Sequence, residues 1–419
     1  MEQKLISLLG LFVMMTLAWY MSSNPSKVSL RIVVGGVALQ FFFAFLILGT
    51  GPGMDFFQFL GDTFKKLLGC VDEGTNFLFG GLVHGEDGLL ALKILPTIIF
   101  FSAFMSILYY LGVVQVVIRA MAWAMQKTLQ TSGAESLSAA ANIFVGQTEA
   151  PLVIKPYVAK MTNSELMAVM VGGFATVAGG VLAFYVSLGI DARHLLVASI
   201  ISAPAALLIA KILQPEVEEP VTGWSGVGSA EEAGKSESSP GETEFSDAPE
   251  EAVNIIDAVA RGTVTGVKLA INVGAMLIVF IALIAVVNGL LGWVGGFFDY
   301  GHLSLEKIFG YLFWPFAWLM GVDTADCDKV GHLLGIKMVA NEAVAYIEMK
   351  DLVISDRSRA IATYALCGFA NFASIGIQIG GIGPLAPKRQ GDLARLGLKA
   401  MLGGTLAAFM TACIAGILL

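Results

Sequence analysis

Apolar segments close to the length of a bilayer crossing recur from one end of this sequence to the other, and they constrain the fold more than any other feature. Of the 419 residues, 56% are hydrophobic and 14% are charged, against about 25% charged in ordinary soluble domains. Roughly 20 predominantly apolar residues suffice to cross the hydrocarbon core as a helix. The sequence therefore predicts an all-α polytopic membrane protein.

Eight such segments are expected to cross the membrane, with two re-entrant hairpins among them. The expected spans are 5–21, 32–48, 95–118, 166–190, 195–213, 253–291, 360–382 and 393–419. Residues 54–80 and 303–319 mix aromatic and charged side chains, so we expect both to lie as amphipathic helices in the membrane interface. Because 253–291 is much too long for one straight crossing, we expect that helix to be steeply tilted.

Basic residues in the short loops predict the orientation of the chain. Lys388, Arg389 and Arg395 crowd the last loop, and loops rich in basic residues are predominantly cytoplasmic. Counting the spans back from that loop places Lys160 and the loop holding Lys27 on the same side. Both termini are then expected outside the cytoplasm.

One segment accounts for the formal charge of −8. Residues 214–251 contain eleven acidic residues and one lysine among many Ser, Gly and Pro, and the rest of the chain is slightly basic. A segment with so few apolar residues cannot bury enough surface to fold alone. We therefore expect an acidic, disordered cytoplasmic linker over 214–252.

A polar stretch interrupts one of the most apolar parts of the chain. Gln147, Thr148 and Glu149 lie between a glycine and a proline, where a helix is expected to break. Polar and ionisable groups at membrane depth mark a substrate or ion pathway by default. A backbone break there is tolerated only where it is buried in protein or lines a cavity. We expect a re-entrant hairpin over 137–158 with these residues at its tip.

The stretch around Glu149 has a counterpart later in the chain. Glu149 is followed 24 residues later by Gly-Phe-Ala-Thr at 173–176, and Glu342 is followed 26 residues later by Gly-Phe-Ala-Asn at 368–371. On the expected topology the two hairpins enter from opposite sides of the membrane. Inverted repeats of this kind place substrate and ion sites at mid-membrane between broken helices.

The repeat divides the chain into five parts. We expect N-terminal scaffold spans with an interfacial helix, a first repeat, the acidic linker, a long tilted scaffold helix with an interfacial helix, and a second repeat. Each repeat combines a re-entrant hairpin with two spans. In that order, the five parts cover residues 1–120, 121–213, 214–252, 253–325 and 326–419.

The candidate ligand-binding residues have structural explanations as well. Glu149 and Glu342 can each hold a hairpin tip through hydrogen bonds, and a serine such as Ser374 is more often a helix-packing residue. Asn371 lies three positions before Ser374, however, so the two side chains share one helix face and favour a site. The four cysteines and four histidines show no paired spacing, so neither a disulfide framework nor a metal site built from them is indicated.

Three motifs resemble the signatures of the concentrative nucleoside transporter family. They are Gly-Gln-Thr-Glu-Ala-Pro at 146–151, Asn-Glu-Ala-Val-Ala-Tyr at 341–346 and Gly-Phe-Ala-Asn-Phe-Ala-Ser-Ile at 368–375. The resemblance covers nearly the whole chain and is strongest to the short bacterial members with eight spans. Ala343 stands where an aromatic residue is usual, and Ala373 stands where serine is common. Both departures bear on pocket packing and selectivity.

The resemblance implies a nucleoside site shared by the two hairpins. The first hairpin tip of the family contacts the nucleobase, which implies this role for Gln147, Thr148 and Glu149, whose side chains offer donors and acceptors. The second hairpin and the broken helix after it hold the ribose. The counterparts here are Glu342, Asn371 and Ser374 for the ribose, with Val181, Leu269 and Phe369 as apolar positions flanking sugar and base.

The resemblance also implies a sodium site between the first hairpin tip and an unwound helix. The counterparts that supply side-chain and backbone oxygens are Asn142, Val145, Thr176 and Val177. Sodium is then the coupling ion, and no other cofactor is implied. The family further implies a homotrimer in which each protomer has its own pathway, here in a bacterial inner membrane.

Together the motifs and the resemblance imply a sodium-coupled secondary active importer of nucleosides, such as uridine, that works by alternating access. We expect no enzymatic activity and no nucleic-acid partner. Three alternatives stay open: coupling to protons, a nucleoside-gated channel, and an intramembrane hydrolase that uses Glu149 and Glu342 as an acid/base pair on a glycosidic bond. The choice between purines and pyrimidines and the number of sodium ions also stay open.

Overall fold

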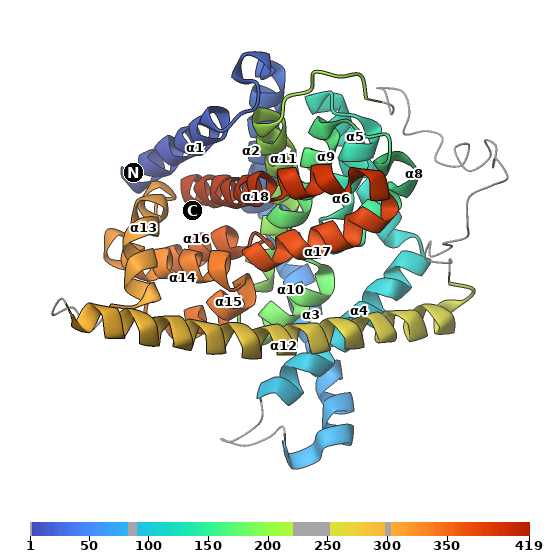
Figure 1. Cartoon of the computed structure of the whole chain (residues 1–419). Coiled ribbons are helices and arrows are strands. Elements are labelled where there is room, and N and C mark those ends of the chain that lie inside the picture. The colour runs from blue at the N-terminus through green and yellow to red at the C-terminus, as the bar shows by residue number, and fades with distance from the viewer. Residues whose placement is uncertain (1, 83–89, 221–251, 298–302) are drawn as a thin grey trace.

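The computed structural model describes residues 2–82, 90–220, 252–297 and 303–419, and within these ranges the regular structure is helical (Figure 1). The predicted all-α membrane fold is therefore confirmed. The helices of the first half are α1 Glu2–Tyr20, α2 Leu30–Leu48, α3 Gly51–Phe79, α4 Leu90–Tyr110, α5 Val113–Leu129, α6 Gly133–Ala141, α7 Ala150–Val153, α8 Lys155–Val158, α9 Asn163–Ala175, α10 Gly179–Ser187 and α11 Ala192–Leu213. Those of the second half are α12 Ile255–Gly296, α13 Leu305–Leu319, α14 Cys327–Val339, α15 Glu342–Asp351, α16 Asp356–Leu366, α17 Phe372–Ile382 and α18 Gln390–Leu418.

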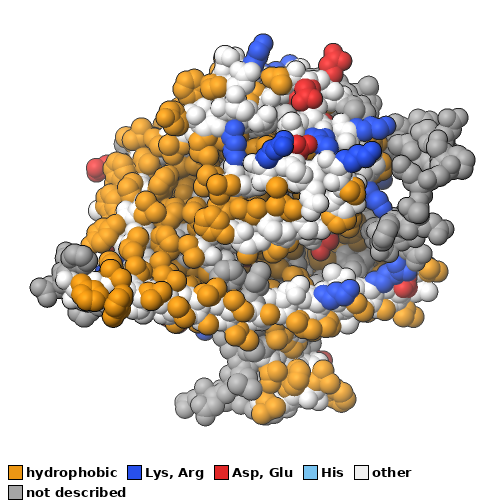
Figure 2. Space-filling view, in the orientation of Figure 1, with side chains coloured by type: hydrophobic (Ala, Val, Ile, Leu, Met, Phe, Trp, Pro, Cys, Tyr) orange, Lys and Arg blue, Asp and Glu red, His pale blue; other side chains and the backbone are white. Residues whose placement is uncertain are grey.

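Several of these helices are long and apolar enough to cross a membrane. In the described ranges five helical segments qualify, or six if one bent pair counts as a span. Figure 2 shows hydrophobic side chains spread over a broad part of one face, and large apolar side chains such as Leu5, Phe12 and Phe42 are exposed. An apolar exterior of this extent suits contact with lipid. The total of eight spans and two hairpins stays a prediction.

Three of the predicted spans are not continuous helices. The expected span 95–118 is not one straight helix, because the chain bends by 74° between α4 and α5. Gly112, which begins α5, has φ of 77°, a left-handed conformation that glycine adopts at little cost and that ends the preceding helix. The expected spans 166–190 and 360–382 are each broken in the middle, at 176–178 and at 367–371.

The long helix predicted after the linker is present as one element. Helix α12 runs unbroken for 42 residues, which at 1.5 Å per residue is about 63 Å. It lies along one edge of the molecule, where α4 packs across it (Figure 1). A helix twice the thickness of the hydrocarbon core must tilt or leave the membrane; the steep tilt expected of this segment stays a prediction.

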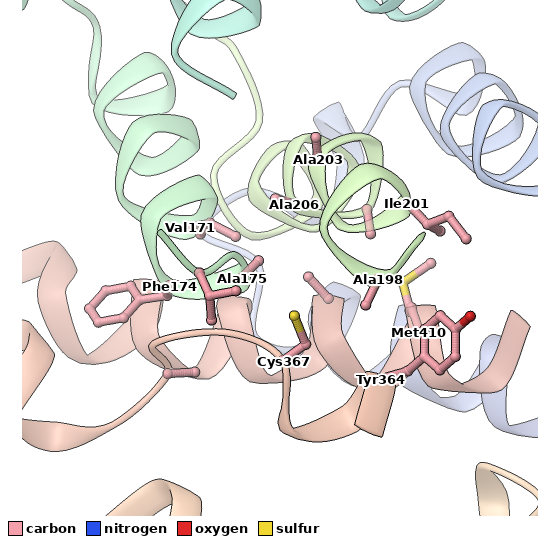
Figure 3. Packing of buried hydrophobic residues seen from close by; sticks show 14 of the residues in the cluster. Val171, Phe174, Ala175, Ala198, Ile201, Ala203, Ala206, Tyr364, Cys367 and Met410 are labelled. Carbon is pink, nitrogen blue, oxygen red and sulfur yellow. The ribbon is translucent and has the colours of Figure 1, made fainter. Parts of the chain in front are cut away.

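Helices α9, α11 and α18 form the centre of the molecule. Every residue of α11 from 201 to 213 is buried. Figure 3 shows Val171 of α9 near Ala206 of α11, and Met410 of α18 near Ala198 of α11. Gly404 of α18 faces Phe174 so closely that an added Cβ would lie 2.3 Å from the Phe174 Cβ. Small residues let membrane helices approach in this way.

At both predicted hairpins two helical segments lie next to each other; that they enter the membrane as re-entrant hairpins stays a prediction. In the first, α6 is followed by an irregular stretch over 142–149 and then by the short helices α7 and α8. In the second, α14 is separated from α15 by Ala340 and Asn341 alone. The side chain of Asn341 caps α15 by accepting a hydrogen bond of 3.0 Å from the backbone N–H of Val344. Such caps satisfy backbone donors that a helix start leaves open.

A buried ionic cluster ties the base of the first hairpin to the end of α11. Lys211 Nζ lies 2.7 Å from Glu135 Oε2, and these side chains are 3% and 1% exposed. Lys211 also pairs with Glu216 at 3.3 Å and donates to Ser164 Oγ at 2.8 Å. Glu216 belongs to the start of the predicted linker, of which residues 221–251 lie outside the described residues. The cluster therefore fixes α6, α9 and α11 to one another.

We predict that Lys211→Met strongly destabilises the protein. Removing one partner of a buried ion pair leaves an uncompensated charge and typically costs about 3–5 kcal/mol. The thermal midpoint of the purified protein in detergent measures the loss, and adding Glu135→Gln should restore part of it because the more deeply buried of the two partner carboxylates is then neutral.

Arg261→Met is the matched control, since Arg261 pairs with Asp257 on the surface of α12 and exposed pairs contribute little. Equal shifts for Lys211→Met and Arg261→Met would show that the buried cluster does not stabilise the hairpin base.

Candidate functional site

The breaks in two helices meet at the centre of the molecule. The backbone N–H of Phe369, in the break between α16 and α17, donates to the carbonyl of Thr176, in the break between α9 and α10, at 3.3 Å. Gly368 has φ of 132°, and a Cβ added there would lie 2.7 Å from the Phe174 carbonyl oxygen. Only glycine fits this conformation and this close approach. The two repeats thus cross at their irregular segments.

Glu342 is buried beside this crossing. It is the first residue of α15 and is 4% exposed. The hydroxyl of Tyr185 donates to Glu342 Oε1 at 2.6 Å, and Asn371 Nδ2 donates to Oε2 at 3.3 Å. A carboxylate at a helix N-terminus is further stabilised by the helix dipole. Charge-assisted hydrogen bonds of this kind allow a carboxylate to stay in the interior.

A chain of polar side chains continues from Glu342 to the first hairpin. Asn371 caps α17, since its Oδ1 accepts from the Ser374 N–H at 2.9 Å. The Ser374 hydroxyl accepts from Gln147 Nε2 at 3.3 Å. Gln147 Oε1 in turn accepts from Gln378 Nε2 at 3.1 Å. Four predicted substrate residues, Gln147, Glu342, Asn371 and Ser374, are therefore brought together.

The other predicted substrate residues lie around this network without joining it. The carboxylate of Glu149 accepts a 2.5 Å hydrogen bond from the N–H of Gly146, in its own loop, and its side chain is exposed. The methyl group of Thr148 packs against Gly381 of α17. Phe369 is half-buried in the α16–α17 break. Val181 of α10 is buried, and Leu269 of α12 lies against its neighbour Gly180.

The predicted sodium residues gather where α6 and α9 end. The amide nitrogen of Asn142 donates to the Ser138 carbonyl at 3.1 Å and lies near Gly172, where an added Cβ would be 3.2 Å from it. The hydroxyl of Thr176 donates to the Gly172 carbonyl at 2.8 Å. Val177 is buried in the same break, and Val145 is half-buried in the hairpin loop.

Two oxygens at this position are orphaned. Within the described ranges, Asn142 Oδ1 and Ser138 Oγ are buried and have no hydrogen-bond partner. Buried polar atoms nearly always have a partner, and an exception points to a missing ligand. Carbonyl groups at unwound helix ends suit a sodium ion. The residues therefore fit a small hard cation.

Sequence reasoning did not select three polar residues of the site. Gln378 donates to both Gln147 Oε1 and the Met170 carbonyl, the latter at 3.0 Å. Its position four residues after Ser374, on the same helix face, was a usable signal. Tyr185 carries no such signal, because a tyrosine in an apolar helix is ordinary. Lys337, buried in the second hairpin, stands out only once that hairpin is placed inside the protein.

Comparison with known protein families matches the chain along its length. A family model described as Na+ dependent nucleoside transporter N-terminus matches residues 9–82. A second, described as nucleoside recognition, matches residues 91–191, and a third, Na+ dependent nucleoside transporter C-terminus, matches residues 194–416.

Individual relatives are similar over the whole chain. An uncharacterized transporter of Haemophilus influenzae is 45% identical, over 99% of this chain and 97% of its own length. Sodium/nucleoside cotransporter 1 of Mus musculus is 41% identical, over 99% of this chain and 64% of its own length. Solute carrier family 28 member 3 of Homo sapiens is 42% identical, over 100% and 60% respectively. The chain thus spans less than two thirds of these two animal proteins.

Solved structures with the same fold include two of the transporter CNTnw. Its inward-facing, substrate-bound structure has a TM-score of 0.88 at 43% identity and covers 99% of this chain and 97% of that chain. A variant in an outward-facing state has a TM-score of 0.90 at 43% identity and covers 100% and 98%. On the family models, the relatives and the shared fold, the chain belongs to the concentrative, sodium-dependent nucleoside transporter family, whose members are transporters and not enzymes.

Proposed function

We propose that this protein is a sodium-coupled secondary active importer of nucleosides that works by alternating access. The observation that carries the proposal is the hydrogen-bonded chain from Gln147 through Ser374 and Asn371 to Glu342. It joins both hairpins at the crossing of two broken helices. A polar network of this extent in an apolar interior favours a substrate site over a purely structural one.

Glu342 is proposed to accept hydrogen bonds from the ribose hydroxyls. Tyr185 holds one of its oxygens at 2.6 Å, whereas Asn371 holds the other at the longer distance of 3.3 Å. The second oxygen is therefore the one that a sugar hydroxyl would engage, which releases the Asn371 amide to contact a neighbouring hydroxyl. Hydrogen bonds to an ionised acceptor are about twice as strong as neutral ones.

The first hairpin tip is proposed to meet the nucleobase. The amide of Gln147 already reaches into the network through Ser374 and Gln378, and a base edge could replace either partner. Thr148 and Glu149 lie on the same turn and would complete the polar edge. The apolar residues proposed to flank sugar and base are Val181, Leu269 and Phe369.

Sodium is proposed to bind at the joined ends of α6 and α9. The residues that would hold it are Asn142, Val145, Thr176 and Val177. Asn142 and Gln147 belong to the same irregular stretch between α6 and α7. A cation that orders this stretch would also order Gln147, and would thereby lower the conformational cost of binding the nucleoside. Such coupling is reciprocal, so the nucleoside would raise the affinity for sodium equally.

Proton coupling is the weaker alternative, because neither Asn142 nor Thr176 titrates near neutral pH.

A nucleoside-gated channel is disfavoured by the similarity to CNTnw, whose structures include inward-facing and outward-facing states. A channel could not move a nucleoside against its own gradient, whereas a coupled transporter could. The hydrolase alternative is excluded by membership of a transporter family.

In the proposed orientation, both termini lie on the non-cytoplasmic side of a bacterial inner membrane. Loops predicted to be cytoplasmic lie together. Arg389 donates a hydrogen bond to Asn163 Oδ1 at 3.0 Å, and the backbone N–H of Ser23 donates to the Leu213 carbonyl at 2.9 Å. The two ends of the chain also meet, since Lys4 Nζ donates to the Leu418 carbonyl at 3.4 Å. The contact between the two termini supports an even number of crossings.

A homotrimer is proposed as the assembled form. Exposed apolar residues follow one another at intervals of seven or eight positions along α12 and so form one stripe on its surface. They are Val264, Ile271, Ile278, Val286 and Trp293. The stripe is available for contact with another protomer or with lipid, and chemical cross-linking in native membranes distinguishes the two.

We predict that Glu342→Gln reduces discrimination for the ribose hydroxyls. The substitution keeps the shape of the side chain but removes its charge, and losing such hydrogen bonds costs about 1–3 kcal/mol, or roughly tenfold to a hundredfold in affinity. Binding of uridine and of its deoxy analogues to wild type and variant measures this coupling directly. Equal losses for ribose and deoxyribose nucleosides would mean that Glu342 is structural.

We predict that Asn142→Ala weakens the response to sodium more than the contacts to nucleoside. Its side-chain oxygen would be one ligand of the ion, so the sodium concentration for half-maximal uptake should rise roughly tenfold, the effect of about 1.4 kcal/mol. Uptake of labelled uridine into proteoliposomes at fixed pH, with sodium varied, tests this. At saturating sodium the variant should recover most of its nucleoside affinity. Uptake that ignores sodium but follows a pH gradient would favour proton coupling instead.

A further inference from the structure

Lys337 is a buried amine that has no role in the proposed transport cycle. It lies in the last turn of α14, the first arm of the second hairpin, and is 1% exposed. Its Nζ donates to the carbonyl of Ala365 at 2.9 Å. Ala365 belongs to the last turn of α16, which ends at Leu366 where the helix breaks. The ammonium group therefore lies at the open C-terminal end of a half-helix.

That position is favourable for a cation. The last carbonyl groups of a helix lack intrahelical donors, and they carry the negative end of the helix dipole. Lys337 also interacts electrostatically with Glu342 and Cys367. A buried ammonium group is tolerated only with such compensation, because an isolated one would lose its hydration without gaining hydrogen bonds or an opposite charge.

The first repeat has an equivalent position. There the side chain of Asn142, at the end of the first arm α6, approaches Gly172 in the last turn of α9. Gly172 lies ten positions after Thr162, the N-cap of α9, and Ala365 lies ten positions after Ser355, the N-cap of α16. The end of the hairpin arm thus meets the same turn of the half-helix in both repeats. In the first repeat it brings an unpartnered oxygen, and in the second an ammonium group.

We propose that Lys337 is a covalently attached counterpart of the sodium ion, held in the second repeat at the position that sodium would take in the first. Inverted repeats bring similar half-helix ends to the centre of the membrane, and each such end attracts a cation. In the second repeat, the side chain of Lys337 occupies the cation position at the half-helix end. This inference rests on the sodium site of the proposed function.

The consequence is a fixed stoichiometry. A nucleoside is neutral, and the charges of Glu342 and Lys337 return with the empty carrier, so the net charge moved in one transport cycle is that of the sodium bound in the first repeat. One sodium ion and one positive charge should therefore cross per nucleoside. The side chain cannot leave, so the second repeat contributes no ion to the coupling.

The charge carried per nucleoside in the unsubstituted protein is the first test. Current and labelled uridine flux, measured together in proteoliposomes, should give a ratio of about 1, with a Hill coefficient for sodium of about 1, since that coefficient cannot exceed the number of sites. A ratio of about 2 would overturn the proposal without any variant. An absence of sodium dependence would instead overturn the proposed function.

The second test replaces Lys337 in the full-length protein. Lys337→Gln should lower the thermal midpoint in sodium-free buffer, and added sodium chloride should recover more of that midpoint than potassium chloride does. The Hill coefficient for sodium-dependent uridine binding should rise above 1, because a second ion now enters. Lys337→Arg keeps the charge and should behave as the unsubstituted protein in both measurements.

Lys329→Gln is the matched control. Lys329 lies on the same helix and likewise donates to a backbone carbonyl, that of Val353 at 2.8 Å, but its side chain is 39% exposed. The Lys329→Gln variant should leave the Hill coefficient and the sodium response unchanged. A folded Lys337→Gln variant whose sodium response equals that of the Lys329→Gln variant would overturn the proposal. If Lys337→Gln does not fold, the charge ratio of the unsubstituted protein still decides.

Discussion

The burial of one carboxylate, Glu342, is the constraint on which the centre of this structure depends. An ion in an apolar interior has to be compensated by hydrogen bonds and opposite charge. Tyr185 and Asn371 supply the hydrogen bonds, and Lys337 in the same hairpin adds a smaller electrostatic attraction. Tyr185 lies in α10 and Asn371 lies in the break before α17. The hydrogen bonds that Glu342 requires therefore hold the second hairpin against both broken helices.

Broken helices make this arrangement possible. An intact helix satisfies its own backbone groups and offers nothing to a ligand, whereas the breaks at 176–178 and 367–371 turn backbone groups inward. The contact between Phe369 and Thr176 joins the two breaks, and Gly368 lets the chains approach closely enough for it. Elsewhere in lipid such breaks would be too costly. Here each repeat shields the break of the other.

The two repeats use the same geometry for different purposes. At the end of α9 the structure presents Asn142 with an orphaned oxygen, and at the end of α16 it presents the ammonium group of Lys337. One position is suited to an exchangeable cation and the other to a permanent one. The difference gives a physical reason for a transporter to couple its substrate to one ion although its fold is nearly symmetric. On this proposal, the identity of residue 337 sets the number of sodium ions that cross with each nucleoside.

The sequence by itself determined the fold class, and it predicted the two hairpins and a site shared by the polar motifs. Apolar length forces helices in lipid, and polar residues such as Gln147 and Glu342 are too costly there without a function. It did not determine where helices bend or break, because residues 95–118 carry no charge and the conformation at Gly112 separates α4 from α5. Nor did it single out Tyr185, Gln378 or Lys337. Their roles arise from contacts with residues more than twenty positions away, and such contacts exist only after the helices have packed.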